Sequence, residues 1–465
     1  MTVKALLLAA AFIAAPAASQ EMRPDQTAFR ALYKELVETN TTLSSGSCTD
    51  AAAKLAVHLK AAGFADSDIT LFNTPENPKE GGIVAILKGS DAKAKAILLL
   101  GHLDVVEAKR EDWTRDPFTL VEENGYLYGR GTGDDKAQAA IWTDTLIRYK
   151  QSGKAPRRTL KLALTCGEET TFAFNGADWL AKNKPGLIAA EFALNEGGGG
   201  RNDAAGKPVG MGVQVGEKTV QNFKVEATNP GGHSSVPRPD NAITDLSRAL
   251  IKVNTYEFPV QFNDTTRTFF TSMSKAVPAP IGAALTTLLA NPGDAAANAI
   301  VSQDPMFHST LRTTCVATQI TAGHAMNALA QRATATVNCR MFPGTDPEKI
   351  RADLVAIIGD PKVTVSMIPP IRPVAVSPPL NPAVLGPMKT LAEKHFPGVP
   401  FSTTMSTGAT DAIFLSPIGI PTYGAPGMFG DPDGNGVHGL NERIRIKSLM
   451  QARDYLNDLI HALAG

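Results

Sequence analysis

The first half of the chain alternates short apolar runs with segments of helical pattern, and this alternation is the strongest constraint on the fold. The apolar runs are GGIVAILKG (81–89), AILLLGHLDVV (96–106), TLKLALTCGEE (159–169) and EFALNEGGGG (191–200). The segments of helical pattern are 50–63, 136–153 and 176–183. Such an order is typical of an α/β domain with a mainly parallel sheet, in which the apolar runs form buried strands.

Histidine and carboxylate side chains stand directly after these apolar runs. In a parallel sheet the carboxyl ends of the strands share one edge, where ligands bind. The side chains that follow a run are those of His102, Asp104, Glu168, Glu169 and Glu196. Each cluster alone would also fit a solvated loop. Together with Asp134 and His438 they supply the ligand types of a two-zinc site, including a carboxylate that can bridge the metals.

The pattern changes near residue 217, where a second domain is expected. Its predicted strands are 221–235, 313–320, 333–342 and 362–368, and its predicted helices are 240–254 and 346–359. This β-α-β-β-α-β order indicates an α+β open-faced sandwich of the ferredoxin-like type. Residues 255–310 interrupt it and are expected to form an added helical excursion. The predicted organisation is one discontinuous domain, 20–216 with 371–465, and an inserted domain, 217–370.

The N-terminal 19 residues have the pattern of a secretory signal peptide. A single Lys4 is followed by an apolar run at 5–15 and by small residues up to Ser19. A membrane-spanning helix needs about 20 apolar residues, so no span is expected. We therefore expect export to a periplasm, with full secretion as the alternative. Lys+Arg and Asp+Glu are both 45, so no basic excess indicates a nucleic-acid partner.

The four cysteines match no zinc-finger or CxxC spacing. Cys315 and Cys339 each lie twelve residues from Asn327, so a hairpin that turns there would place them opposite one another. A disulfide and two buried free thiols are both compatible with this placement. Cys48 and Cys166 are expected to be free.

In combination these motifs resemble those of the co-catalytic zinc exopeptidases. That family includes glutamate carboxypeptidase, aminoacylase-1, succinyl-diaminopimelate desuccinylase and carboxypeptidase S. The resemblance covers nearly the whole mature chain. It rests on GHLDVV, YGRGTGDDKA, GEE, LNEGGG, GGHSS, NCRMFPG, STGATDA and VHGLNE.

The resemblance implies a role for each matching residue of the first domain. Two zinc ions would be held by His102, Asp134, Glu169, Glu196 and His438, with Asp134 as the bridge. Glu168 would act as general base and general acid. Asp104 would orient the ring of His102 from behind.

The resemblance also implies substrate contacts. His233 would reach an active site, often that of the partner subunit, and stabilise the oxyanion; the alternative is a turn histidine bonded to local backbone. Arg340 would bind the free carboxylate of the substrate, with an edge-strand ion pair as the alternative. Asn327 would lie near the same site. Gly408 and Thr410 would contact the substrate.

The implied function is that of an exported zinc hydrolase that cleaves an amide bond next to a free carboxylate. A carboxypeptidase or dipeptidase is expected, and an N-acyl-amino-acid amidohydrolase is the alternative, so the substrate would be a peptide or an N-acyl amino acid. The resemblance further implies a homodimer formed through the second domain, which would act as a lid. A catalytically silent relative or a transport-associated binding protein would have no need for Glu168 and a full ligand set.

Overall fold

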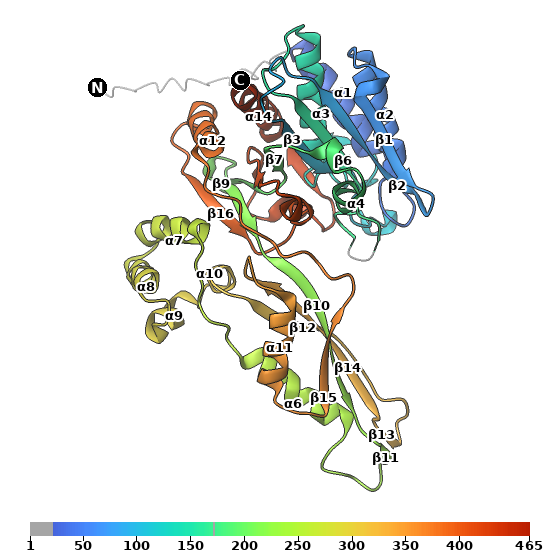
Figure 1. Cartoon of the computed structure of the whole chain (residues 1–465), viewed down its shortest axis with the longest axis vertical. Helices are drawn as coiled ribbons and strands as arrows, with labels where there is room; N and C mark the ends of the chain where they lie inside the picture. The colour runs from blue at the N-terminus through green and yellow to red at the C-terminus, as the bar shows by residue number, and fades with distance from the viewer. Residues whose placement is uncertain (1–21, 171–172) are drawn as a thin grey trace, which may run out of the picture.

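The computed structural model describes residues 22–170 and 173–465, and the expected signal peptide at 1–19 lies outside them. The described chain forms a larger body built around a six-stranded sheet and a smaller body built around a four-stranded sheet (Figure 1). The chain crosses from the larger to the smaller body at Lys218, between β9 (Pro208–Glu217) and β10 (Thr219–Thr228), and it returns after β15 (Val363–Ile368). The expected domain boundaries lie beside these two crossings.

The central sheet of the larger body is mainly parallel. In spatial order its strands are β1 (Ile69–Thr74), β2 (Asn77–Leu87), β6 (Leu160–Thr165), β3 (Ile97–His102), β7 (Phe192–Asn195) and β17 (Thr422–Gly424). The last four are mutually parallel, whereas β1 and β2 form an antiparallel hairpin at one edge. The expected mainly parallel sheet is therefore confirmed, with an antiparallel margin that the sequence pattern did not indicate.

Both faces of this sheet are covered, which explains why its inner strands are apolar throughout. Leu99 of β3 packs into the cluster beneath one helical layer, and Leu98 packs into the cluster on the opposite face. The helices of the first layer are α1 (Pro24–Glu38), α2 (Cys48–Ala61), α3 (Lys136–Gln151) and α14 (Ile446–Ala464). Those of the second are α4 (Gly176–Asn183), α5 (Pro185–Ile188) and α13 (Ala412–Leu415). A strand buried on both faces cannot show a polar side, so it shows no alternation.

Two smaller sheets and one further helix complete the larger body. One sheet has the order β16 (Phe401–Ser406), β9, β8 (Gly198–Asn202) and β18 (Phe429–Gly430). The other has the order β19 (Arg443–Arg445), β5 (Tyr126–Tyr128) and β4 (Val121–Glu123). The helix is α12 (Pro382–His395), which packs against α14. In the described part of the chain no helix is both long and apolar enough to cross a membrane.

The smaller body has the expected β-α-β-β-α-β order. Its sheet is antiparallel and runs β12 (Thr314–Ala322), β14 (Arg332–Met341), β10 and β15. Helices α6 (Ala242–Thr255) and α11 (Pro347–Ile358) pack on one face of this sheet through a shared apolar core. The buried positions of β10 alternate strictly with half-buried ones, as expected for a sheet with one covered face.

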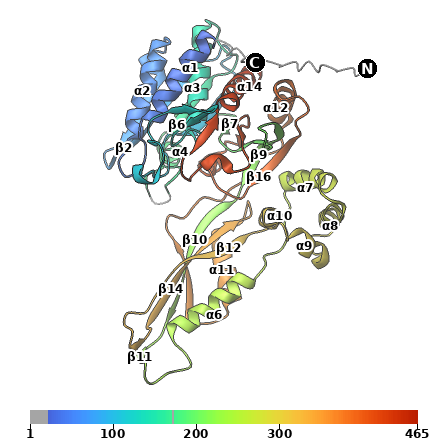
Figure 2. The same ribbon diagram turned by 180° about the vertical axis from the view of Figure 1, so that it is seen from behind.

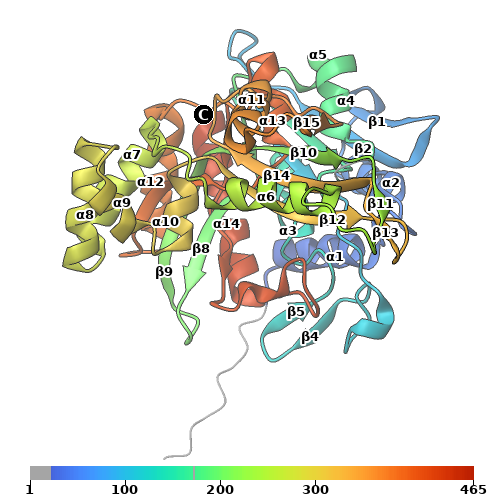
Figure 3. The same ribbon diagram turned by 90° about the horizontal axis from the view of Figure 1, so that it is seen from below.

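Residues 264–310 form a helical excursion with its own small core. Its helices are α7 (Asp264–Ala276), α8 (Ala279–Ala290), α9 (Ala295–Val301) and α10 (Pro305–Thr310). Phe270, Leu285 and Phe307 lie at the centre of this core. Figure 3, which looks along the molecule, shows α7, α8 and α9 to one side of the smaller body. The excursion thus adds to the sandwich without entering its sheet.

Both cysteine pairs form disulfides, and one of them corrects an expectation. Cys315 and Cys339 are directly opposite in the β12–β14 register and are bonded. The expectation that Cys48 and Cys166 are free is wrong, because they are bonded across 118 residues of chain. Helix α2 packs against β2, and β2 pairs with β6, so the start of the helix reaches the end of β6. Only this packing brings the two residues together, and no local pattern encodes it.

Candidate active site

Three neighbouring parallel strands bring the expected ligands to one edge of the sheet. His102 is the last residue of β3, Glu168 and Glu169 follow β6, and Glu196 follows β7. These strands lie side by side in the order β6-β3-β7 and run in the same direction. Their carboxyl ends therefore meet, as expected from the apolar runs of the sequence.

Asp134 lies between two histidines and presents one oxygen to each. Its Oδ1 is 3.1 Å from Nε2 of His102, and its Oδ2 is 3.1 Å from Nε2 of His438. Oε1 of Glu169 lies 3.0 Å from the same nitrogen of His438, and Oε1 of Glu196 lies 3.8 Å from Nε2 of His102. These contacts join the five side chains into one cluster with Asp134 between the two histidines, which suits a bridging carboxylate. Ligand atoms of His102, Asp134 and Glu169 all lie within 4.8 Å of one another, as do those of His102, Glu168 and Glu196.

Asp104 supports this arrangement through both its backbone and its carboxylate. The ring Nδ1 of His102 is 3.0 Å from the backbone oxygen of Asp104 and 3.6 Å from its carboxylate. When Nδ1 donates to that carbonyl, Nε2 has its lone pair free for a metal. The carboxylate of Asp104 also accepts hydrogen bonds from the backbone N–H of Glu169 (3.0 Å) and of Glu168 (3.4 Å). Asp104 therefore holds the turn that carries both glutamates.

The charge distribution of the cluster fits a bound cation. Burial raises the pKa of Glu168 and of Glu196 well above the ordinary range of a carboxyl group. Burial opposes the charged form of Asp134 too, but hydrogen bonds to His102 and His438 outweigh it and lower its pKa. Asp134 and Glu169 raise the pKa of His438 to about 10. Oε1 of Glu196 is buried without a hydrogen-bond partner among the described residues. Crowded carboxylates with an unpaired oxygen and imidazole nitrogens suit a divalent metal with O and N ligands.

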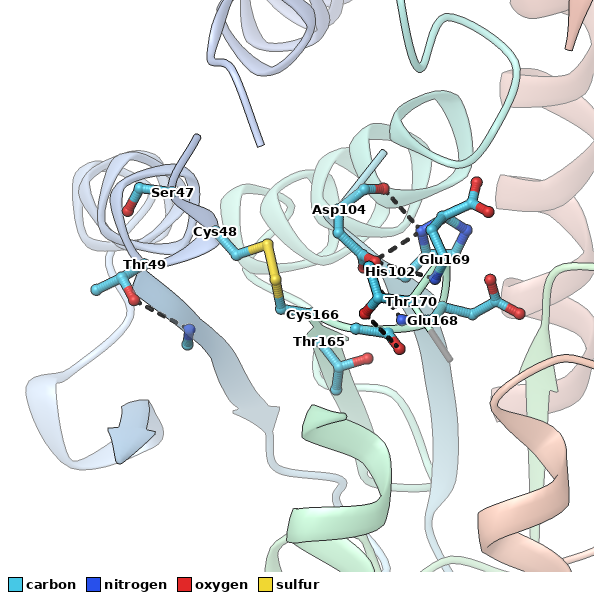
Figure 4. The surroundings of a disulfide bond; sticks show 12 residues. Ser47, Cys48, Thr49, His102, Asp104, Thr165, Cys166, Glu168, Glu169 and Thr170 are labelled. Atoms are coloured by element: carbon cyan, nitrogen blue, oxygen red, sulfur yellow. Dashed lines mark hydrogen bonds and ion pairs between the residues drawn. A yellow bond between two sulfur atoms is a disulfide. The ribbon is translucent and has the colours of Figure 1, made fainter. Parts of the chain in front are cut away.

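A disulfide bond anchors the turn that carries Glu168 and Glu169. Cys166 directly precedes Gly167, Glu168 and Glu169, and its bond to Cys48 ties the turn to the start of α2. Figure 4 shows this bond beside Asp104, with both glutamates on the far side of the turn. Gly167 has φ +99°, and a Cβ there would lie 1.8 Å from the carbonyl oxygen of Phe174, so only glycine fits.

A cavity of about 390 Å³ opens between the two bodies at this point. From the larger body it is lined by Glu168, Glu169 and His438, and from the smaller body by Arg340. Gly408 and Thr410 line it as well. The structure therefore brings together, around one space, the expected base, two ligands and the expected carboxylate-binding arginine.

The surroundings of Arg340 do not fit the ion-pair alternative. Arg340 lies on β14, an inner strand, and burial lowers the pKa of its guanidinium. Its Nε donates to Oδ1 of Asn338 at 3.2 Å. In the described ranges no carboxylate forms an ion pair with it. A partly buried guanidinium that faces a cavity without an anionic partner is suited to an anion from outside the chain.

His233 and Asn327 lie together, but away from this cavity. His233 belongs to β11 (Gly232–His233), which pairs with β13 (Ala328–Leu329) at the far tip of the smaller body (Figures 1 and 2). The imidazole Nδ1 accepts a hydrogen bond from the backbone N–H of Ser235 at 3.2 Å, and the carbonyl of Asn327 accepts one from Ser234. Neither residue lines the 390 Å³ cavity of its own chain.

Two buried acidic residues near the site were not expected from the sequence. Asp411 accepts hydrogen bonds from Thr165 (3.0 Å) and Asn175 (2.6 Å) and lines the cavity, and burial raises its pKa to about 6. Glu442 binds the loop before α3. Both belong to motifs that carry the resemblance, STGATDA and VHGLNE. Their position in these motifs was the available signal, because neither the side-chain hydrogen bonds of Asp411 nor the backbone hydrogen bonds of Glu442 leave a periodic pattern in the sequence.

Comparison with known proteins identifies the family of the chain. The family model for peptidase family M20/M25/M40 matches residues 98–462. The chain belongs to this family. It is thus a metallopeptidase-type hydrolase, and the resemblance inferred from its motifs is confirmed.

The relatives span most of the chain. Human N-fatty-acyl-amino acid synthase/hydrolase PM20D1 is 27% identical over 401 residues, which cover 84% of this chain and 78% of that protein. Probable carboxypeptidase S-like 2 of Dictyostelium discoideum is 29% identical over 390 residues, covering 80% and 72%. The structure of the M20 family metallo-carboxypeptidase Sso-CP2 from Sulfolobus solfataricus matches with a TM-score of 0.71 at 18% identity, covering 95% of this chain and 100% of the other. The di-peptidase Dug1p from Saccharomyces cerevisiae matches with a TM-score of 0.65 at 19% identity, covering 94% and 96%. The two structural matches support the fold.

Proposed function

We propose that this protein is a two-zinc carboxypeptidase or dipeptidase that cleaves an amide bond next to a free carboxylate. The observation that carries the proposal is the shared cavity, because Arg340 and Glu168 line one space together with Glu169 and His438. Arg340 would bind the terminal carboxylate and so place the adjacent amide bond near Glu168. Cleavage would then be restricted to the last bond of a peptide, which is exopeptidase specificity.

Different residues of the chain would bind the metal ions, transfer the proton and position the catalytic turn. Asp134, Glu169 and His438 would hold one zinc ion, and His102, Asp134 and Glu196 the other. Bound zinc supplies Lewis acidity toward the carbonyl and lowers the pKa of a water molecule. Glu168 would take the proton from the attacking water at its carboxylate and deliver it to the departing amine. Asp104 keeps the Glu168 turn in place through its two backbone hydrogen bonds.

Hydrolysis of N-acyl amino acids is the second candidate. It is favoured by the likeness to a protein named N-fatty-acyl-amino acid synthase/hydrolase. Val220, Ile368, Ile413 and Phe414 give part of the cavity an apolar lining, which suits an acyl chain as well as a side chain. Both candidates require the same carboxylate contact and differ only in the group on the acyl side.

A substrate panel tests the proposal. The purified chain would be assayed on dipeptides, N-acyl amino acids and the carboxyl-amidated form of each, before and after chelation and after return of zinc. We expect zinc-restored hydrolysis of dipeptides that is lost on amidation. Faster cleavage of N-acyl amino acids would select the second candidate. Activity indifferent to chelation, or none in the presence of zinc, would contradict the proposal.

Replacement of Arg340 by methionine is expected to lower kcat/KM for free-carboxylate substrates by about 10- to 100-fold, since a charge-assisted hydrogen bond contributes about 1.5–3 kcal/mol. The amidated substrates should hardly change. Arg332→Met is the matched control, because Arg332 is an exposed residue of the same strand that pairs with Glu226. Equal losses of kcat/KM on free-carboxylate and amidated substrates would show that Arg340 does not bind the carboxylate of the substrate.

We infer a homodimer that forms through the smaller body. Strand β12 is an edge strand with exposed Val316 and Ile320, so another strand can pair with it. The position of His233 and Asn327 at the tip of the smaller body also supports a dimer. A residue at this tip lies far from the cavity of its own chain, so it could contact only the cavity of another copy.

Mixing two inactive variants is expected to restore activity. Glu168→Gln and His233→Ala chains each lack one group, but a mixed dimer contains one complete site. Random exchange should therefore restore up to about a quarter of the wild-type activity, given two-fold symmetry. The assay is hydrolysis after co-refolding, with each variant alone as the control. No recovery in verified mixed dimers would exclude a role for His233 across the interface.

We infer export to the periplasm or the medium. The two disulfides support it, because such bonds persist in oxidising compartments and are rare in the cytosol. Fractionation of the producing cell, with a blot for the chain, tests this inference.

A further inference from the structure

A buried ion pair contacts the loop that carries the expected metal ligand Asp134. Nη1 of Arg130 is 2.8 Å from Oε2 of Glu442, and the two side chains are only 2% and 1% exposed. Burying two charges costs several kcal/mol per ion, and apolar replacement of such a pair is often neutral or stabilising. Its contribution to stability is therefore a weak explanation for the pair, and its contacts point to another role.

The carboxylate of Glu442 accepts hydrogen bonds from backbone amides of the loop that ends in Asp134. Oε1 accepts hydrogen bonds from the N–H of Gly133 (2.8 Å) and of Asp134 (3.2 Å). Oε2 accepts one from the N–H of Gly131 (2.9 Å) in addition to that from Arg130. Both oxygens of one side chain thus determine where the bridging ligand Asp134 leaves the loop.

The same pair also holds the turn that carries His438. Glu442 lies four residues after His438, and its backbone carbonyl accepts a hydrogen bond from Gly129 at 3.0 Å. Nη2 of Arg130 donates to the carbonyl of Gly439 at 2.7 Å. His438 itself is 56% exposed and has φ +58°, so little packing restrains it. The loop at 129–134 and the turn at 438–442 are therefore joined by one buried clamp, formed by Arg130 and Glu442.

We propose that Glu442 is a positioning residue for the metal centre. Through the clamp it sets the 3.1 Å approach of Asp134 to His438, so that both can bind one cation. This inference rests on the proposed zinc centre and deepens it, because it adds a residue that governs metal affinity without touching the metal. Supporting residues of this kind typically change metal affinity by about 10- to 100-fold.

A calcium loop is the competing explanation for the same segment. Asp431, Asp433, Asn435, Gly436 and Glu442 match the spacing of an EF-hand loop. The side chains do not converge as such a loop requires, since Asp431 pairs with Arg445, Asp433 pairs with Arg443 and Glu442 faces Arg130. The segment is also flanked by β18 and β19, whereas an EF-hand loop lies between helices.

The test is zinc affinity of Glu442→Gln, measured on metal-free protein by competition with a chromophoric chelator. Glutamine keeps the size but turns one acceptor oxygen into an NH₂ group that faces N–H donors. We expect both zinc equivalents to bind more weakly, because Asp134 is shared between them, and the equivalent held with His438 to weaken most, by about 10- to 100-fold. The circular dichroism spectrum of the metal-free chain should change little. Glu442→Asp keeps the charge with a shorter reach, and it serves if the glutamine variant does not fold.

The controls separate the possible outcomes. Asp433→Asn alters an exposed residue of the preceding loop that pairs with Arg443 rather than with the clamp, and the zinc affinity of this variant should equal that of wild type. Unchanged affinity for both zinc equivalents in Glu442→Gln would overturn the proposal, as would a weakening in proportion to a general loss of stability. Calcium binding by wild type that is lost in Glu442→Gln would also overturn it. If wild type binds zinc but hydrolyses no substrate of the panel, the proposed function fails while the clamp still stands.

Discussion

Replacement of Glu168 by glutamine is expected to lower kcat by about 10²- to 10⁴-fold, the usual contribution of a general acid–base residue. Glutamine has nearly the same shape but cannot accept the proton of the attacking water. The side chain lines the cavity, and its backbone is held independently by Asp104, so the fold of the turn should survive the change. The measurement is steady-state hydrolysis of the best substrate of the panel, with zinc content determined on the same sample.

The adjacent glutamate provides the control for this prediction. Glu169 contacts His438 at 3.0 Å, so Glu169→Gln should lose zinc before it loses anything else. Glu168→Gln should instead keep its zinc and its KM while kcat falls. If Glu168→Gln retains more than about a tenth of the wild-type kcat, far above what loss of a general base allows, another group moves the proton.

Removal of the Cys48–Cys166 disulfide by a double exchange to alanine is expected to cost about 4–5 kcal/mol in the free energy of unfolding. This value follows from the chain-entropy model for a loop of 118 residues. Activity should fall as well, because the bond anchors the residue that precedes the Gly167–Glu169 turn. Urea unfolding checks the first part, and kcat, measured under conditions in which the double variant is still folded, checks the second.

The second disulfide is the matched control, because it lies in the smaller body. Cys315 and Cys339 close a loop of only 24 residues, so their removal should cost about 3–4 kcal/mol on the same model. It should leave kcat of the folded protein nearly unchanged, since neither residue lines the cavity. An equal loss of kcat in both double variants would mean that the turn does not depend on the Cys48–Cys166 bond.

The contrast between the two disulfides shows where sequence reasoning succeeds. Cys315 and Cys339 are placed opposite one another by the symmetry of a hairpin, which can be counted along the chain. Cys48 and Cys166 meet only because α2 packs beside β2 and β2 pairs with β6. The second relation requires the assembled sheet, and the expectation of free thiols was wrong for that reason.

The residues expected to contact the substrate also differ in how much the sequence could predict about them. The sequence motifs pointed to Arg340 and to Gly408 and Thr410, and the structure brings all three to the cavity. The absence of a carboxylate partner for Arg340 within the described residues could be seen only after folding. The distance of His233 and Asn327 from the cavity of their own chain likewise depends on the length of the smaller body, which no motif states.

By itself the sequence determined the fold class and the identity of the metal-ligand candidates. Apolar runs that end in His102, Glu168 or Glu196 place these residues at strand ends, and the ends of parallel strands meet at one edge. The tertiary structure alone decided what else holds the candidates in position, namely the hydrogen bonds of the Asp104 carboxylate to the glutamate turn, the Cys48–Cys166 bond and the clamp of Arg130 and Glu442. Periodicity records which face of an element is buried. Contacts between segments far apart in the sequence arise from how the layers pack, and no local pattern records them.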